Sequence, residues 1–289
     1  MFGFLFKRSP TVDERLETHW KILLMRGYSD QTIRLKRHYS RIFSAQFGNR
    51  RIDKINRIEL KQWLLERAEN TPSHTRCVLI FIRDFYTEAM IDGVIEHSPA
   101  EYIKLPTVEV RRKRLTEDEF LRTYARVPEN HFFRRALELA ITTGQRRADI
   151  EKMSAEHVWD GYLHIIQHKG QKKHPKRIAL PLSLKSPLLD KNLGEIIEQC
   201  LRESQGKTLL QNKHKKPVSR SQLSVLFQDY RDNPDKIGEP SFHEIRSLAE
   251  RTYKKIGIDT QTLLGHKHQK MTDIYNDTRG LPEYKKLIL

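Results

Sequence analysis

Cysteine is nearly absent from this chain, whose 289 residues include only Cys77 and Cys200. The two form no Cys-x-x-Cys pair and no cysteine–histidine spacing typical of zinc ligands. This pattern argues against a disulfide framework and against a structural zinc site. The sequence also shows no cluster of carboxylates suited to Mg²⁺. We therefore expect a protein of a reducing cytoplasm that uses no metal and no cofactor.

Long apolar segments are missing as well. The opening residues 1–6 (MFGFLF) are apolar but too short for a signal peptide or a membrane span, and Lys7 and Arg8 follow them directly. No later run of apolar residues reaches membrane-spanning length. We therefore expect an intracellular protein with no membrane partner.

Acidic residues are the minority among the charged ones. The chain has 37 Asp and Glu against 53 Lys and Arg, which gives a formal net charge of +16 and a pI of about 9.8. The basic excess is present in both halves of the chain. Such a surplus favours a polyanionic partner, because each phosphate that is neutralised releases condensed counterions. Double-stranded DNA is the expected partner. The alternative is that this chain is merely a soluble basic protein, whose charge has no such role.

Helical patterns fill the first hundred residues. Thr11 and Glu14 form a capping box that predicts a helix through about Met25. Three further helices are expected over residues 29–47, 58–67 and 73–91. A glycine falls where a helix should end at three positions, Gly27, Gly48 and Gly93.

The helical pattern breaks near residue 105, and residues 105–116 have the composition of a linker. This segment contains Pro106 and a run of four basic residues, Arg111, Arg112, Lys113 and Arg114. Between two basic domains the run is well placed to contact a phosphate backbone, although such runs are often only solvated. We therefore divide the chain into an N-terminal extension (1–10), a helical DNA-binding domain (11–104), this linker (105–116) and a second domain (117–289).

The second domain is expected to be mixed α/β. Thr116 and Glu119 form a capping box at its start. Residues 162–166 have strand composition, and residues 177–180 can return as a hairpin partner. Helices are expected over residues 117–127, 131–142, 146–153, 190–204, 219–231, 242–256, 259–264 and 268–277.

Five short segments of the second domain carry residues suited to chemistry at a phosphate. They are residues 143–150 (TGQRRADI), 167–169 (QHK), 243–246 (HEIR), 264–266 (LGH) and Tyr275. In this order and spacing they resemble the tyrosine recombinases, and within that family the integrases of lambda-like phages. The resemblance covers about residues 110–289. It implies a helical core-binding (SAM-like) domain followed by a tyrosine-recombinase catalytic domain with a small β-sheet.

The resemblance implies a role for each of these residues in cutting and rejoining DNA. Tyr275 would be the nucleophile that forms a covalent 3′-phosphotyrosine bond, without ATP or metal. Arg146 and Arg246 would clamp the non-bridging phosphate oxygens, for which a planar guanidinium that stays charged is well suited. The structural alternative for any single arginine is an ordinary surface salt bridge.

The remaining family roles concern protons. His243 would accept or shuttle a proton, and His266 would donate to a phosphoryl oxygen. Lys169 resembles the family lysine that protonates the leaving 5′-oxygen. Here the sequence departs from the family, because the common Lys-Thr-Gly is replaced by Lys169, Gly170 and Gln171.

The family also implies a homotetramer assembled on paired DNA sites in the cytoplasm of a bacterial host. Lambda-like integrases carry a small arm-binding domain for which no room is left before Thr11, so the chain is expected to be a simpler recombinase or a truncated one. Integration, excision, inversion and resolution stay open. A type IB topoisomerase-like relaxation of DNA and a catalytically silent DNA-binding regulator are the alternatives.

Overall fold

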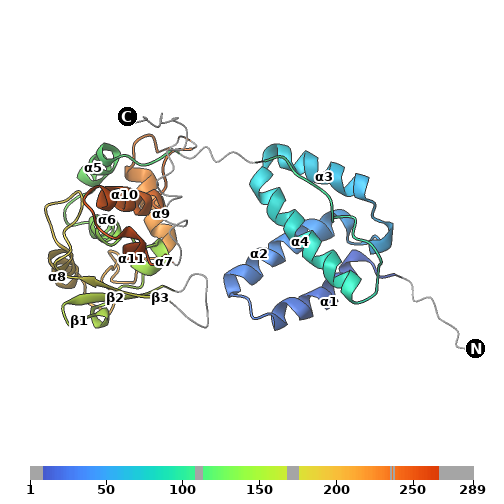
Figure 1. Cartoon of the computed structure of the whole chain (residues 1–289), viewed down its shortest axis with the longest axis horizontal. Coiled ribbons are helices and arrows are strands. Elements are labelled where there is room, and N and C mark those ends of the chain that lie inside the picture. The colour runs from blue at the N-terminus through green and yellow to red at the C-terminus, as the bar shows by residue number, and fades with distance from the viewer. Residues whose placement is uncertain (1–8, 108–112, 168–175, 235, 237, 267–289) are drawn as a thin grey trace, which may run out of the picture. The chain divides into compact units, whose positions relative to one another are not determined.

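The computed structural model describes residues 9–107, 113–167, 176–234, 236 and 238–266. Contacts divide the chain into two compact units, Met1–Val110 and Arg111–Leu289, each with its own hydrophobic core. The first unit is helical, and the second combines helices with a small antiparallel sheet (Figure 1). The predicted fold class is therefore confirmed.

The described residues of the first unit form four α-helices. Thr11 caps the first of them with both hydrogen bonds of the predicted capping box, and Ser29 and Asn56 cap the second and third. Large aromatic side chains from the second and fourth helices fill the core, among them Phe43, Phe47, Phe81, Phe85 and Tyr86. The helices are α1 (Val12–Met25), α2 (Asp30–Phe47), α3 (Arg57–Asn70) and α4 (Pro72–Ile91), with a short 3₁₀ turn η1 (Ile52–Lys54).

In its described residues the second unit combines helices with a three-stranded sheet of order β1-β2-β3, which lies at one edge of the unit (Figure 1). Its strands are β1 (Val158–Trp159), β2 (Tyr162–Gln167) and β3 (Lys176–Pro181), and the predicted hairpin is the β2–β3 pair. Its helices are α5 (Glu117–Arg126), α6 (Phe132–Thr143), α7 (Arg147–Ile150), α8 (Leu193–Glu203), α9 (Arg220–Tyr230), α10 (Glu244–Lys255) and α11 (Thr260–Leu264), with a 3₁₀ turn η2 (Ala155–His157).

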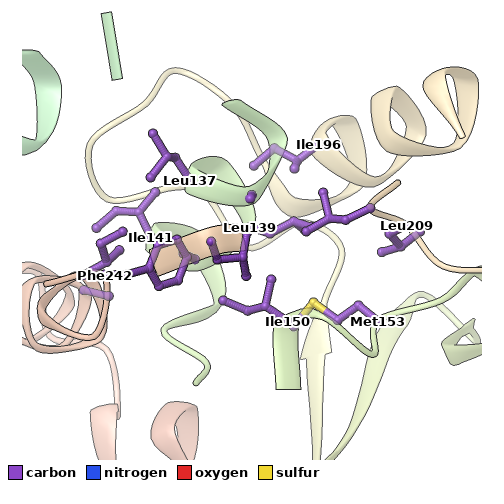
Figure 2. Packing of buried hydrophobic residues seen from close by; sticks show 14 of the residues in the cluster. Leu137, Leu139, Ile141, Ile150, Met153, Ile196, Leu209 and Phe242 are labelled. Atoms are coloured by element: carbon purple, nitrogen blue, oxygen red, sulfur yellow. The ribbon is translucent and has the colours of Figure 1, made fainter. Parts of the chain in front are cut away.

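Helix α6 lies at the centre of the second unit. Every residue from Arg135 to Thr143 is buried, because α8, α9 and α10 all pack against this helix. Its side chains therefore meet partners from distant parts of the chain on all sides. Figure 2 shows Leu137, Leu139 and Ile141 of α6 among Ile150, Met153, Ile196, Leu209 and Phe242. This packing fixes the C-terminal end of α6, where the candidate active site begins.

One local expectation was wrong in extent, and one short element was not expected. A helix was expected over residues 146–153, but α7 ends at Ile150. The chain turns away there because Ser154 forms a bridge with Thr208, and Leu209 donates to the Met153 carbonyl. The short strand β1 was not foreseen, since two residues are too few to form a pattern. The helix expected over residues 268–277 lies outside the described residues.

No helix in the described parts of the chain is long and apolar enough to cross a membrane.

Candidate active site

The site begins at the turn that follows α6. Gly144 ends this helix in a left-handed conformation, with φ of 62°. A Cβ atom at this position would lie 3.0 Å from Leu264 Cδ2, so both the backbone angle and the close approach of α11 favour glycine. After this turn the chain reaches Arg146, which occupies the N-cap position of α7. The turn therefore places Arg146 directly after the buried C-terminal end of α6.

Arg246 is buried in the first turn of α10, with 1% of its surface exposed. Its guanidinium reaches two backbone carbonyls: Nη1 donates to Gly144 O at 2.7 Å, and Nη2 donates to Leu264 O at 2.7 Å. Burial of a cation is costly unless its donors are satisfied. The two carbonyls meet part of that need and hold the guanidinium between the end of α6 and the end of α11.

His266 lies beside this guanidinium. Arg246 Nη2 also donates to His266 Nε2, at 3.0 Å. An imidazole nitrogen can accept this bond only when it carries no proton, so the ring is neutral and its proton sits on Nδ1. Burial, together with the positive charges of Arg246, Arg146 and Lys176, lowers the pKa of His266 to about 4. His266 is therefore a neutral donor, through Nδ1, near pH 7.

Arg146 completes the cluster from the other side. Its Nη1 donates to Gln167 Oε1 at 3.2 Å, and its side chain is half-buried. Its charge acts on the pKa of His266, as that of Arg246 does. The fold thus brings together three of the residues that the sequence singled out, although Arg146 and Arg246 stand a hundred positions apart.

His243 precedes the first residue of α10 and is half-buried. Its carbonyl accepts from the backbone N–H of Arg246 at 3.2 Å, so the two residues lie one helical turn apart on one face, as their spacing predicted. Four of the other predicted positions fall outside the described residues: Arg111, Arg112, Lys169 and Tyr275.

The two described residues of the basic linker run are engaged within their own unit. Lys113 Nζ lies 2.7 Å from Glu119 Oε1 and 3.7 Å from Glu239 Oε2. Arg114 Nη1 lies 3.2 Å from Glu244 Oε2 and donates to Ser247 Oγ at 2.8 Å. Their charges are therefore balanced by carboxylates within the unit, and a contact of the run with phosphates stays a prediction.

Sequence reasoning gave no role to three residues that build this site. Gln167 Nε2 donates to Gln145 Oε1 at 2.6 Å and to Leu264 O at 3.1 Å. Gln145 Nε2 donates to Leu263 O at 2.8 Å. Lys176 donates from Nζ to the Gly265 carbonyl. Both glutamines lie inside the singled-out segments, but a glutamine offers no chemistry of its own that would mark it.

The arrangement suits a tetrahedral oxyanion. Two guanidinium groups and a neutral imidazole lie together, and such preorganised donors stabilise negative charge without rearranging during a reaction. Within the described ranges, no group of three or more His, Cys, Asp or Glu side chains is placed to hold a metal ion. The donors of the cluster come from side chains alone.

Comparisons with known proteins agree with this chemistry. Residues 113–280 match the phage integrase family. The chain is 33% identical to the integrase of Enterobacteria phage P21 over 255 residues, which are 83% of this chain and 66% of that protein. It thus spans about two thirds of the length of that relative.

The fold is also similar to solved structures of lambda integrase. One is a dimer bound to a COC′ core site, with 29% identity, a TM-score of 0.87, and coverage of 98% of this chain and 81% of that one. A second is a tetramer bound to a Holliday junction, with the same identity of 29%, TM-score of 0.87 and coverage of 98% and 81%. The chain belongs to the phage integrase family, that is, to the tyrosine recombinases.

Proposed function

We propose that this chain is a site-specific DNA recombinase, an integrase that cleaves and rejoins DNA through a covalent 3′-phosphotyrosine intermediate. The observation that carries the proposal is the cluster of Arg146, Arg246 and His266, whose donors lie together in a chain of the phage integrase family. The net charge of +16 supports a polyanionic substrate.

In the proposed cleavage step the Tyr275 hydroxyl attacks a phosphorus atom of the DNA backbone. A bond forms between its oxygen and phosphorus, and the bond from phosphorus to the 5′-oxygen breaks. His243 accepts the phenolic proton, and Lys169 supplies a proton to the departing 5′-oxygen. Arg146, Arg246 and the Nδ1–H of His266 stabilise charge on the non-bridging oxygens. Attack by the 5′-hydroxyl of another strand reverses these steps, so joining consumes no ATP.

The proposed working unit is a homotetramer on two paired DNA sites, in the cytoplasm of a bacterial host. The lambda integrase tetramer bound to a Holliday junction supports this assembly. Within the chain we assign residues 11–104 to a core-type DNA-binding domain, residues 105–116 to a linker and residues 117–289 to the catalytic domain. Integration and excision are the proposed outcomes, since the relatives are phage integrases.

Relaxation of DNA in the manner of a type IB topoisomerase would use the same covalent bond. Inversion or resolution by a recombinase would use the same strand exchange. No observation favours either of them over integration. The matched family and the relatives reported above are integrases. The products of the reaction distinguish all of these outcomes.

The test is to incubate the protein with a pool of random-sequence duplexes carrying nicks and to trap protein–DNA adducts after denaturation. Wild type should yield adducts that share a sequence, and Tyr275→Phe should bind the same duplexes but give none. Sequencing the joints formed between two copies of the recovered site then reveals strand exchange. Adducts that persist in Tyr275→Phe would rule out this nucleophile, and the absence of adducts in wild type would overturn the proposed function.

A further inference from the structure

A pair of buried glutamines connects the two arginines of the candidate active site. Arg146 Nη1 donates to Gln167 Oε1 at 3.2 Å, and Gln167 Nε2 donates to Leu264 O at 3.1 Å. The same carbonyl accepts from Arg246 Nη2 at 2.7 Å. One continuous path of hydrogen bonds therefore runs from one guanidinium to the other through the Gln167 side chain and the Leu264 carbonyl, and Gln145 holds the Gln167 amide in place.

The orientation of both amides is fixed by their neighbours. Gln167 is 3% exposed and Gln145 is 2% exposed. Gln145 uses its Nε2 on the carbonyls of Thr143, at 2.9 Å, and Leu263, at 2.8 Å, so its Oε1 is the atom left to accept from Gln167 at 2.6 Å. A flipped Gln167 amide would face Arg146 with donors and Leu264 O with an acceptor. Both contacts would be repulsive, so only one orientation is stable.

The surrounding backbone leaves Gln167 little room to move. Gln167 is the last residue of β2 and pairs with Lys176 of β3, whose side chain donates to the Gly265 carbonyl. Gly265 has φ of 62°, and a Cβ atom there would lie 2.6 Å from Ile178 Cδ1 and 3.0 Å from Gln167 Oε1. The amide of Gln167 is thus packed directly against the turn that carries His266.

We propose, on the basis of the recombinase function proposed above, that Gln167 is a positioning residue: its Oε1 holds the Arg146 guanidinium, with Gln145 holding the amide in turn. Arg146 is only half-buried, and a long side chain at the surface loses its orientation without a fixed acceptor. Gln167 touches no reacting atom in this scheme. Its effect reaches the phosphate through Arg146, whose planar fork must face the non-bridging oxygens as they gain charge.

The test compares three glutamine-to-methionine variants, since methionine keeps the length of the side chain and removes its hydrogen bonds. Gln167→Met removes the acceptor of Arg146. Gln145→Met removes the second amide but leaves the Arg146–Gln167 contact. Gln199→Met is the matched control, because Gln199 Oε1 accepts from Arg135 Nη1 at 2.8 Å near the opposite end of α6. Each variant is measured for melting temperature, affinity for the recovered duplex and single-turnover rate of adduct formation.

Gln167→Met should slow adduct formation by roughly tenfold to a hundredfold, the scale expected for a misplaced catalytic group, with a much smaller change in affinity. Gln145→Met should lower the melting temperature comparably but slow the reaction less, and Gln199→Met should leave the rate near that of wild type. A rate that simply follows the melting temperature across all three variants would overturn the proposal, because it would assign Gln167 a purely structural role.

A double-mutant cycle tests the route through Arg146. In an Arg146→Lys chain the further change Gln167→Met should have little effect on the rate, because the orientation that it protects has already been lost. If Gln167→Met slows adduct formation as much in the Arg146→Lys chain as in wild type, Gln167 does not act through Arg146. If wild type forms adducts and Gln167→Met matches its rate, this inference alone fails. If wild type forms none, the proposed function fails.

Discussion

Arg246 and His266 share a hydrogen bond in which Nη2 of the arginine donates to Nε2 of the histidine at 3.0 Å. The bond makes the protonation state of one residue depend on the charge of the other. A protonated His266 would place a cation against the buried guanidinium and would lose the lone pair that accepts this bond. The pair therefore acts as a unit in which the histidine stays neutral and offers its second nitrogen as a donor.

The first prediction concerns acid stability. The pKa of His266 is lowered from 6.5 to about 4 in the folded chain. Between pH 6.5 and pH 4 the unfolded chain therefore binds a proton at this residue that the folded chain does not bind. The stability present above pH 6.5 should thus decline as the pH falls toward 4, by about 3 kcal/mol. His266→Gln keeps an acceptor for Arg246 but cannot titrate, so its stability should depend less on pH.

Urea unfolding without DNA measures this difference. In a chain with Trp20→Phe and Trp63→Phe, fluorescence reports Trp159, the one tryptophan of the second unit. The comparison with His266→Gln removes the contributions of other histidines. Equal pH dependence in the two chains would show that His266 is not held neutral by the fold.

The second prediction is that lysine cannot replace either arginine. Arg146→Lys and Arg246→Lys keep the charge but lose the planar fork, and Arg246→Lys cannot serve Gly144 O, Leu264 O and His266 together. We expect adduct formation to slow by about 10²–10³, by analogy with the removal of an oxyanion donor. Single-turnover cleavage of a nicked duplex measures this rate. If either variant cleaves almost as fast as wild type, the arginine that it replaces does not clamp the phosphate.

The third prediction separates the proposed proton donor from its neighbour. Lys169→Ala should cleave ordinary DNA slowly but recover on DNA whose 5′-bridging oxygen is sulfur, because a thiolate leaves without a proton. Lys176→Ala should not recover in this way, since Lys176 donates to the Gly265 carbonyl. The ratio of cleavage rates on the two substrates is the measurement. Recovery in Lys176→Ala and none in Lys169→Ala would exchange the two roles.

The fourth prediction divides the basic linker run. Lys113 and Arg114 are paired with Glu119 and Glu244. Replacing them with alanine should therefore lower the melting temperature and have little effect on the affinity for DNA. Replacing Arg111 and Arg112 should weaken binding to all DNA. Each lost phosphate contact should reduce the slope of log affinity against log salt by about 0.9. Fluorescence anisotropy over a range of salt gives this slope, and identical slopes for both pairs would refute the division.

Local signals in the sequence predicted a large part of this molecule. The capping boxes at Thr11 and Thr116 form as expected, with both reciprocal hydrogen bonds. The β2–β3 hairpin followed from strand composition alone. The resemblance to the tyrosine recombinases predicted that Arg146, Arg246 and His266 lie together, and in the fold each lies at or near the end of a helix.

Contacts between distant residues could not be predicted in the same way. Arg114 meets Glu244 across 130 positions, and no local pattern announces such a partner. Gln167 alternates with Leu163 and Ile165 on the buried face of β2. A polar residue on such a face only interrupts the apolar pattern and predicts no partner. Only the fold shows that the carbonyl of Leu264 lies opposite it and that its amide has a fixed orientation.

Two of the acceptors of Arg246 are carbonyl oxygens of the main chain, those of Gly144 and Leu264. A point mutation can delete a carboxylate or an amide side chain, but it cannot delete a peptide oxygen. Substitutions of the neighbouring side chains therefore leave these two hydrogen bonds of Arg246 in place. A substitution disrupts them only by displacing the chain, as a Cβ atom at Gly144 or Gly265 would. A directed-evolution library for new DNA targets can thus vary the surroundings widely, provided that these two glycines are kept.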